Sequence, residues 1–519
     1  MIQTLISMVK HTGRRRAPAA GILPDLSLAA LERHARLPDT RAVESLDAFI
    51  VMAAPGESNL WGALPESARW RALAARSKPA ALTWHVSALA NARQTHAVLG
   101  YAKPTASAFE RLSFAAKLIG EIAGRRPRRV GLLVSETLPD AASWCEALLS
   151  AAWSASFALP HYRSKRGDPW RLESLQVYAA PVLAAERLAA TARGGNLVRA
   201  LTAMPPNKLD AGTYLKLLRT LARRHRMQLR WYSESALRRL GAGAFLAVSR
   251  ANAARNAGIA HLRWRAPGRA RSQPQVALVG KGILFDTGGV NLKSHRSMLD
   301  MHIDMSGSAV ALATLMALAE LRAPVAADAW LAITENNIGP SAYRPQEVVR
   351  ACNGTTIQVI HSDAEGRMVL ADTLALAART RPALMLDFAT LTGACITALT
   401  ERYSAVFTNR PAIAETLLAA GRDSGERVWT FPLVEDFDTD IESTVADVAQ
   451  CAVEGRGDHI LAARFLQRFV ADRPWVHVDL GSATRRGGLA HVTTEITGFG
   501  VRWALELLLN PRLRRQLAA

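Results

Sequence analysis

The 519 residues of this chain exceed what one hydrophobic core usually organises, so two or more domains are expected. Apolar residues make up 49% and charged residues 21% of the sequence, as in globular enzymes. No uncharged apolar run is long enough to predict a transmembrane helix or a membrane partner. The net charge of +20 has two explanations, non-specific binding to DNA through counterion release or a solvated arginine-rich surface.

Residues 1–39 are predicted to form a basic tail and lead-in that is disordered at its start. The first 24 residues contain no acidic side chain and include Arg14, Arg15 and Arg16, which follow the apolar stretch 1–9. A secretory signal has the opposite order, with its charges before the apolar stretch. A mitochondrial transit peptide remains the alternative.

The four cysteines are Cys145, Cys352, Cys395 and Cys451, far apart and without a Cys-x-x-Cys pair. This spacing argues against a disulfide framework and against a thiolate zinc site. It favours a cytoplasmic location, where thiols stay reduced. Cys395 has no evident activating base in the sequence, so it is predicted to be a core residue.

Residues 40–194 are predicted to form a smaller N-terminal α/β domain. Short β-prone runs predict strands, and apolar positions at helical spacing predict helices. The expected strands are 48–52, 82–86, 97–99, 130–134 and 175–178, and the expected helices are 106–123 and 141–157. This segment has no constellation of reactive groups, so we expect it to act in packing or assembly. A boundary is expected at Gly194–Gly195, which leaves residues 195–519 for a larger domain.

A first group of reactive side chains in the larger domain begins with Lys281 and Asp286. They follow the strand-like run 276–279, and Asp304 precedes the helix-like run 309–321. The glycines among them do not match the dinucleotide fingerprint, because its third glycine would fall at Phe285. They do not match the P-loop either, because glycine rather than Ser or Thr follows the lysine. A nucleotide site is therefore not expected.

A second group lies in the segment 361–367, between the strand-like run 355–360 and the helix-like run 368–377. If this segment stays extended, Asp363, Glu365 and Arg367 lie two residues apart and point to one side. Taken alone, the pattern has an alternative, an acidic turn that caps a helix.

The two groups together supply four carboxylates. Oxygen donors in this number suit one or two divalent cations that serve in hydrolysis. Lys281 is an unusual companion, because an ammonium group has no lone pair to donate. It could bind a metal only as the neutral amine, which burial and adjacent dications favour by lowering its pKa.

Both groups resemble the leucine aminopeptidase (cytosol aminopeptidase) family, whose hallmark reads Asn-Thr-Asp-Ala-Glu-Gly-Arg. The resemblance covers residues 196–510 well and the front of the chain weakly. It implies two divalent ions per subunit, Mn²⁺ or Zn²⁺, one held by Lys281, Asp286, Asp304 and Glu365 and the other by Asp286, Asp363 and Glu365. It also implies that Lys293 is the electrophilic lysine and that Arg367 is the catalytic arginine, which works in the family with bound bicarbonate.

The family's activity implies a metal-dependent aminopeptidase that removes an apolar, leucine-like N-terminal residue from peptides. A hydroxide that bridges the two metals would attack the first carbonyl. The implied architecture is two α/β domains, the larger with a mixed, mainly parallel sheet flanked by helices, assembled as a homohexamer. The residues expected next to the substrate are Met301, His361, Thr390, Leu391 and Gly393.

The sequence also departs from the family pattern. His361 and Ser362 replace the first two residues of the hallmark, and Asn291 stands where the lysine loop usually has serine. Residues 457–460 read Gly-Asp-His-Ile where the family has small residues near the pocket, which leaves the side-chain preference open. Two alternatives follow, a nucleic-acid-binding accessory protein with weak or lost peptidase activity and a catalytically inactive relative. The retained ligands argue against the second.

Overall fold

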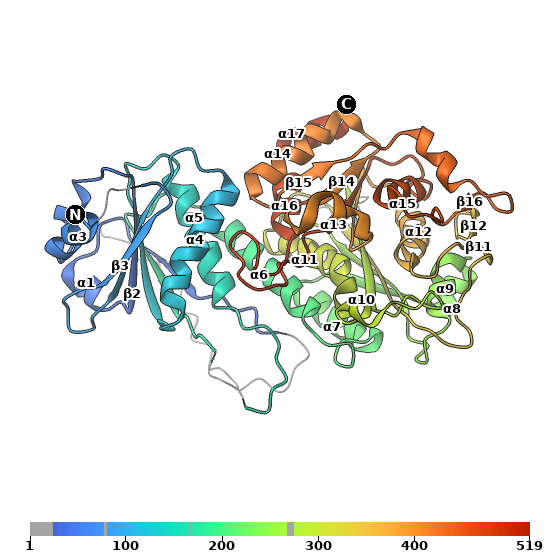
Figure 1. Ribbon diagram of the computed structural model, residues 1–519, viewed down its shortest axis with the longest axis horizontal. Helices are drawn as coiled ribbons and strands as arrows, with labels where there is room; N and C mark the ends of the chain where they lie inside the picture. The colour runs from blue at the N-terminus through green and yellow to red at the C-terminus, as the bar shows by residue number, and fades with distance from the viewer. Residues whose placement is uncertain (1–23, 77–79, 166–168, 267–274, 519) are drawn as a thin grey trace.

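The computed structural model describes residues 24–76, 80–165, 169–266 and 275–518. Two α/β bodies lie side by side, a smaller one from the N-terminal part of the chain and a larger one from the rest (Figure 1). Helix α6 (Ala185–Thr202) lies at their junction. The predicted fold class, α/β with a smaller N-terminal and a larger C-terminal domain, is confirmed. The predicted disordered tail, as far as residue 23, lies outside the described residues.

A six-stranded sheet organises the smaller domain in the order β1-β6-β5-β2-β4-β3. All neighbours are parallel except β3 and β4. Its strands are β1 (Ala30–Arg33), β2 (Ala48–Ala53), β3 (Trp84–Ala88), β4 (His96–Tyr101), β5 (Arg129–Val134) and β6 (Ser174–Tyr178). Its helices are α1 (Thr40–Glu44), α2 (Leu60–Ala63), α3 (Ser67–Ala74), α4 (Ala108–Ala123) and α5 (Ala141–Ala155). Strand β1 lies in the predicted lead-in and was not predicted as a strand. It pairs in parallel with β6, and this long-range pairing leaves no local pattern in the sequence.

An eight-stranded mixed sheet organises the larger domain in the order β15-β14-β17-β13-β9-β10-β8-β7. The central strands β17, β13, β9 and β10 are parallel to one another. At one edge β8 pairs antiparallel with β10 and β7 pairs antiparallel with β8, and at the other edge β14 pairs antiparallel with β17. Its strands are β7 (Gln228–Ser233), β8 (Gly258–Trp264), β9 (Val276–Asp286), β10 (Ala327–Asn336), β13 (Leu384–Ala389), β14 (Ser404–Thr408), β15 (Val428–Thr430) and β17 (Trp475–Asp479). The parallel centre brings the carboxyl ends of β9 and β13 to the same edge.

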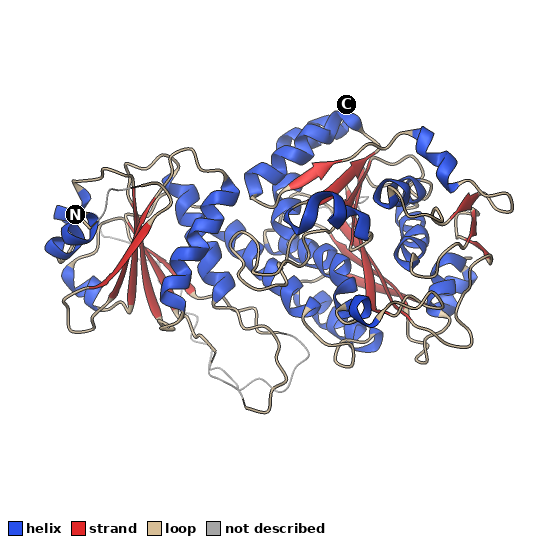
Figure 2. Ribbon diagram, viewed as in Figure 1, coloured by secondary structure: helices blue, strands red, loops and turns tan. Residues whose placement is uncertain are grey.

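Helices cover both faces of this sheet (Figure 2). Consecutive residues of β9 enter opposite cores, Leu278 with α6, α7, α11 and α16, and Val279 with α9, α12 and α15. The helices are α7 (Ala211–Arg224), α8 (Glu234–Arg239), α9 (Gly243–Ser249), α10 (His295–Met298), α11 (Ser306–Glu320), α12 (Glu365–Ala378), α13 (Gly393–Leu399), α14 (Ala414–Ser424), α15 (Asp458–Gln467), α16 (Val501–Leu508) and α17 (Pro511–Ala518). The 3₁₀ helices of this domain include η1 (Met301–Met305), directly before α11, and η4 (Glu435–Ile441).

The strand expected at 355–360 is shorter and lies elsewhere than the central sheet. Strand β12 (Thr356–Gln358) pairs with β11 (Val348–Arg350) and β16 (Val448–Ala449) in a separate three-stranded sheet. The general preference of ligands for the carboxyl ends of sheet strands therefore applies here to β9 and β13, not to β12.

Helix α11 packs closely beneath β9, the strand that carries Lys281. A Cβ on Gly280 would lie 2.5 Å from Ser308 Cα, so only glycine permits this approach. Together η1 and α11 form the stretch Met301–Glu320, the one helical stretch in the described ranges that is long and apolar enough to cross a membrane. Its mean hydropathy is 1.3, and 83% of its apolar window is buried, as in a core helix.

The expected domain boundary at Gly194–Gly195 falls inside helix α6, which continues unbroken from Ala185 to Thr202. A Cβ on Gly194 would lie 2.8 Å from Val501 Cγ1, whereas one on Gly195 would meet no atom within 4 Å. Gly194 thus permits close packing between α6 and α16. A glycine pair is a weak indicator of a linker when tertiary packing can override helix propensity.

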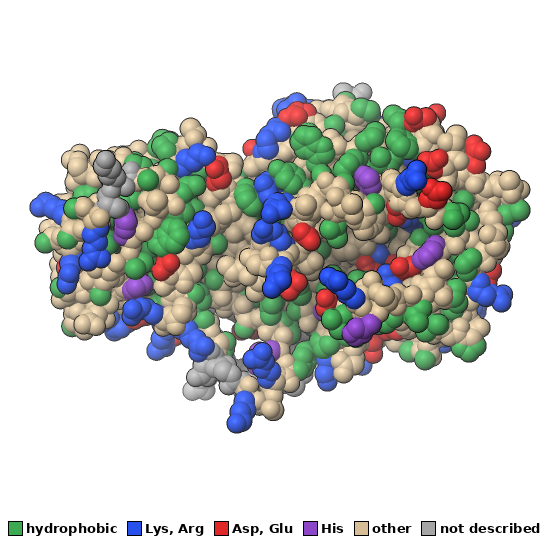
Figure 3. All heavy atoms as spheres, viewed as in Figure 1, with side chains coloured by type: hydrophobic (Ala, Val, Ile, Leu, Met, Phe, Trp, Pro, Cys, Tyr) green, Lys and Arg blue, Asp and Glu red, His purple; other side chains and the backbone are tan. Residues whose placement is uncertain are grey.

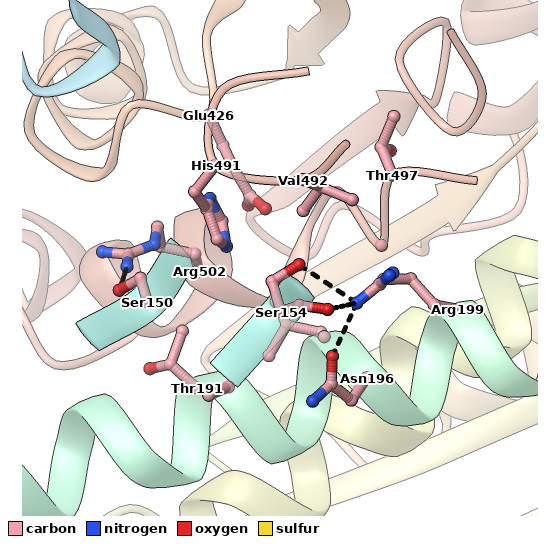
Figure 4. Close-up of a pocket in the computed structure, with 14 residues that line it drawn as sticks. Ser150, Ser154, Thr191, Asn196, Arg199, Glu426, His491, Val492, Thr497 and Arg502 are labelled. Carbon is pink, nitrogen blue, oxygen red and sulfur yellow. Dashed lines mark hydrogen bonds between the residues drawn. The ribbon is translucent and has the colours of Figure 1, made fainter. Parts of the chain in front are cut away.

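Polar contacts join the two bodies at the last turns of α5 (Figure 4). Arg199 of α6 donates from Nη1 to the carbonyl and hydroxyl oxygens of Ser154, both at 3.1 Å. Arg502 of α16 donates from Nη2 to Ser150 Oγ at 2.5 Å. Two helices of the larger body thereby hold one helix of the smaller body.

Candidate active site

The candidate acids meet at the carboxyl end of β9. Asp286 is the last residue of β9, Asp304 lies in η1, and Glu365 is the first residue of α12, with Asp363 two residues before it. One carboxylate oxygen from each of Asp286, Asp363 and Glu365 can be chosen so that all three lie within 4.8 Å of one another. The two groups that are separate in the sequence are therefore one cluster in space.

Residues 363–367 do not stay extended, because helix α12 begins at Glu365. In a helix, residues two apart differ in direction by about 200°. Arg367 therefore leaves the helix in a different direction from Glu365 and pairs with Asp458 rather than with Asp363. The helix predicted from the apolar pattern of residues 368–377 therefore begins earlier, at Glu365, and includes the end of the acidic segment.

Lys281 lies at the centre of the acids, with 3% of its surface exposed. Its Nζ lies 2.8 Å from Asp304 Oδ2 and 2.9 Å from Glu365 Oε1, and it donates to the carbonyl oxygen of Thr390 at 2.8 Å. Burial favours the neutral amine, but the charges of Asp304, Glu365 and Asp286 outweigh it and raise the pKa of Lys281. A Cβ at Gly366 would lie 2.7 Å from this Nζ, so glycine at that position makes room for the lysine.

Lys293 approaches the same acids from the loop after β9. Its Nζ lies 3.0 Å from Asp286 Oδ2 and also contacts Asp363 Oδ1. Gly288 and Gly289, with φ of +84° and +67°, turn the loop back so that the lysine can reach the cluster. Burial opposes the charge of Lys293, but Asp286, Glu365 and Asp363 outweigh it and raise the pKa of its ammonium group.

The donor set fits divalent cations. Asp286, Asp304 and Glu365 are all buried, and burial together with repulsion from Glu365 and Asp286 raises the pKa of Asp304 even though Lys281 lies beside it. Buried acids that repel one another in this way are stabilised by a cation placed between them. Carboxylate oxygens are the ligands that Mn²⁺ and Mg²⁺ prefer, and Zn²⁺ accepts them as well.

Arg367 has a carboxylate partner that the sequence analysis did not assign. Its Nη2 donates to Asp458 Oδ1 at 2.7 Å and to Oδ2 at 2.8 Å, and its Nη1 donates to the carbonyl oxygen of Gln450 at 3.2 Å. Its Nε is enclosed and has no hydrogen-bond partner. Asp458 therefore occupies the face of this guanidinium that would bind a carbonate, and the expected bicarbonate does not fit beside it.

The residues expected beside the substrate fall into two sets. Thr390 donates from Oγ1 to Asp304 Oδ1 at 2.6 Å, and Leu391 lies over Gly366 next to Lys281. His361 is exposed, and its Nδ1 accepts the N–H of Asp363 at 3.2 Å, which shapes the turn that presents this acid. No contact joins Met301 or Gly393 to the acids among the described residues, although Met301 begins η1 and Gly393 begins α13 beside open space.

Two further polar residues that contact residues of the site were not expected from the sequence. Asn336, the last residue of β10, donates from Nδ2 to Asp286 Oδ1 at 2.8 Å and to the carbonyl oxygen of Ser362 at 3.0 Å. Asp479, at the end of β17, accepts the Leu391 N–H at 3.1 Å. Their common signal is a polar residue that ends a buried strand, which is recognisable only once the strands are known.

Cys395 is fully buried, and its Sγ lies 3.7 Å from the carbonyl oxygen of Asp479. Burial raises the pKa of its thiol, so it is a core residue as predicted and not a nucleophile. Figure 3 shows acidic, basic and histidine side chains gathered around a hollow of the larger domain, over the region where Figure 1 labels α10, α13 and α15.

Comparisons with known proteins agree with this geometry. The model of the cytosol aminopeptidase family's catalytic domain matches residues 196–505. A probable cytosol aminopeptidase of Syntrophotalea carbinolica is 38% identical over 397 residues, covering 74% of this chain and 79% of the relative.

Solved structures show the same likeness. The bottromycin maturation enzyme BotP in complex with Mn has a TM-score of 0.77 at 30% identity, with 89% of this chain and 99% of BotP covered. The cytosol aminopeptidase of Coxiella burnetii has a TM-score of 0.75 at 26% identity, with 89% of this chain and 96% of that protein covered. The chain therefore belongs to the cytosol aminopeptidase family, whose members are metal-dependent aminopeptidases.

Proposed function

We propose that this protein removes apolar, leucine-like N-terminal residues from peptides with two divalent cations. The observation that carries the proposal is the convergence of Asp286, Asp363 and Glu365 within 4.8 Å, with Lys281 and Lys293 against them. Membership of the family supports the aminopeptidase chemistry. The apolar preference and the number of cations rest on the resemblance of the residues described above.

The ligands would divide between two cations. One would be held by Lys281, Asp286, Asp304 and Glu365, and the other by Asp286, Asp363 and Glu365. Bound cations would activate water as the nucleophile and polarise the first carbonyl of the peptide. Lys281 would serve as a ligand after losing its proton, since its positive charge is redundant once dications neutralise the same acids.

The chain's own residues would position and stabilise the reacting groups. Lys293 keeps its charge beside Asp286 and Asp363, so its ammonium group would stabilise the negative charge that develops on the carbonyl oxygen. Thr390 contacts Asp304, and Leu391 lies beside Lys281. These two residues would border the N-terminal side chain of the peptide. Met301, Gly393 and His361 would complete that pocket.

Three broader properties are also proposals: a cytoplasmic location, a homohexamer, and Mn²⁺ or Zn²⁺ as the resident ion. The mass of the purified protein in solution tests the hexamer. Metal analysis of protein purified without chelator tests the ion. BotP, with which the fold is shared, was solved in complex with Mn, and that supports Mn²⁺ as the first ion to try.

The decisive experiment measures release of leucine from a leucyl dipeptide. Protein stripped with chelator is reloaded with Mn²⁺ or Zn²⁺ and compared with Asp363→Ala treated in the same way. We expect activity to return with metal in the natural protein and to be absent in the variant. Asp447→Ala is the matched control, because Asp447 is an exposed aspartate whose carboxylate accepts hydrogen bonds from Thr356 instead of joining the cluster.

Two results would contradict the proposal. One is undiminished turnover by Asp363→Ala, which would show that the cluster is not the reacting centre. The other is no release from several N-terminal residues with either metal, while the protein remains folded by circular dichroism. The second result would favour a binding role for the basic surface.

A further inference from the structure

The ion pair between Arg367 and Asp458 lies at the start of two helices, α12 and α15. Arg367 is the third residue of α12, two residues after Glu365, and only 2% of its side chain is exposed. Asp458 is the first residue of α15, and 25% of its side chain is exposed. The carboxylate is therefore the end of the pair that is open to solvent.

The local sequence fixes Asp458 in this position. Gly457 has φ of +62°, a left-handed conformation that glycine adopts without strain, and α15 begins directly after it. The positive end of the helix dipole favours a carboxylate in the first turn. The Arg367 guanidinium, whose two terminal nitrogens are both engaged, supplies the second constraint.

This arrangement excludes an external anion from the arginine. A carbonate beside Asp458 would place a second negative charge on the guanidinium that already binds one, and like charges at such distances repel. The Nε of Arg367 is enclosed by the protein. The carboxylate that the sequence analysis noted only as a departure thus occupies the anion-binding face of Arg367.

We propose that Asp458 replaces bicarbonate as the proton-accepting anion of this enzyme, so that the reaction needs no carbonate. This inference rests on the proposed peptidase function. The proton passes from the attacking water to the Asp458 carboxylate, which becomes a carboxylic acid. The acid then returns the proton to the departing amine nitrogen as the carbon–nitrogen bond breaks, and the carboxylate is regenerated. Arg367 is a positioning residue that holds the Asp458 carboxylate in place through two hydrogen bonds.

The test compares Asp458→Ala, Asp458→Asn and the natural protein, each loaded with metal, in buffer freed of carbon dioxide and again with added bicarbonate. We expect the natural protein to be unaffected by bicarbonate. Asp458→Ala should lose about 10²-fold or more in kcat, the usual contribution of a proton-transfer group, and recover part of it with bicarbonate. Asp458→Asn should lose as much without recovery, because the amide still fills the anion's place but cannot accept the proton.

A second measurement does not depend on turnover. A ligand that binds only the folded protein raises its melting temperature. Bicarbonate should therefore raise Tm for Asp458→Ala and leave Tm unchanged for the natural protein and for Asp458→Asn.

Asp438→Ala is the matched control. Asp438 also pairs with an arginine of α15, Arg464, through contacts of 2.7 Å from Nε and from Nη2. Its loss removes a similar ion pair without opening Arg367. We expect this variant to show no response of kcat or Tm to bicarbonate.

Activation or thermal stabilisation of the natural protein by bicarbonate would overturn the inference, as would full activity of Asp458→Ala without it. Failure of the proposed peptidase function would give a different result from failure of this inference. The natural protein would then be inactive under every condition, while the Tm measurement would still show whether Asp458 occupies the anion site.

Discussion

Asn291 and Ser362 hydrogen-bond to each other in both directions. The Ser362 N–H donates to Asn291 Oδ1 at 2.9 Å, and the Asn291 N–H donates to Ser362 Oγ at 2.8 Å. The first residue belongs to the loop that carries Lys293 and the second to the turn that carries Asp363. Both positions depart from the family pattern, and their mutual bonds bring the two departures into direct contact.

Removal of the Ser362 hydroxyl should weaken the contact between the Lys293 loop and the Asp363 turn. Ser362 is fully buried, and its Oγ also donates to the carbonyl oxygen of Gly288 at 2.6 Å. In Ser362→Ala the half-buried Asn291 N–H loses its acceptor and the Gly288 carbonyl loses its donor, so we expect a loss of about 1–3 kcal/mol in the free energy of unfolding. Denaturant unfolding measures this loss, and kcat should fall because Lys293 is held less firmly.

Ser297→Ala is the control for this variant. Ser297 lies in the same stretch of chain, in α10, but is exposed and contacts only Ser294. It should keep both stability and kcat. If Ser362→Ala and Ser297→Ala have the same free energy of unfolding and the same kcat, the contact between Asn291 and Ser362 does not stabilise the site.

Lys293→Met should separate electrostatic catalysis from substrate binding. Removal of one group that stabilises charge in a transition state typically lowers kcat by about 10²–10³-fold. The expected result is this loss in kcat with a much smaller change in KM, measured with a leucyl dipeptide and saturating metal. Lys117→Met, on α4 of the smaller domain, is the control because Lys117 lies 5.8 Å from the Trp84 ring and far from the acids in sequence and domain. A wild-type kcat in Lys293→Met would remove this residue from the mechanism.

Much of the site could be predicted from local sequence because its parts follow recognisable strands. Lys281 lies within the apolar run of β9, and Asp286 ends that strand. Asp458 could not be assigned to Arg367, since the two are 91 residues apart and only the packing of α15 against α12 brings them together. Asn336 was missed for the same reason, because its strand β10 was not predicted and its target Asp286 is 50 residues away.

In the fold, too, the helices could be predicted from local sequence, whereas the pairing of strands could not. The expected helices 106–123 and 141–157 match α4 and α5 within two residues at each end. The expected strand 355–360 forms as the shorter β12 in a small separate sheet, because the sheet that a strand joins depends on which distant strands are available to pair with it. Register and neighbour in a sheet are long-range properties that periodicity does not encode.

The two glycines inside α6 should respond oppositely to alanine. Alanine is favoured over glycine in a helix interior by about 0.5–1 kcal/mol, so Gly195→Ala should stabilise the protein by roughly that amount. In Gly194→Ala the new methyl would lie 2.8 Å from Val501 Cγ1, and overpacking of this kind costs about 1–3 kcal/mol. Thermal unfolding of the two variants measures the difference. If both substitutions stabilise the protein equally, α6 and α16 are not closely packed at this position.

Glu426 should make stability depend on pH. Burial raises the pKa of its carboxyl group from 4.5 to about 7, although its acceptor bonds from the Gly500 and Trp503 N–H groups act in the opposite direction. Between these two values the folded protein binds more protons than the unfolded chain. The contribution of Glu426 is therefore fully present below pH 4.5 and is lost as pH rises through 7, at no more than about 1.4 kcal/mol per pH unit.

Urea unfolding at several pH values between 5 and 8 tests this dependence. Glu426→Gln keeps an acceptor oxygen for the two N–H groups but cannot ionise, so its stability should fall less than that of the natural protein over this range. Glu415→Gln is the control, because Glu415 is an exposed residue of α14 paired only with Arg422. Parallel pH profiles for the natural protein and Glu426→Gln would mean that Glu426 is already ionised in the folded state, held so by its neighbour Arg502.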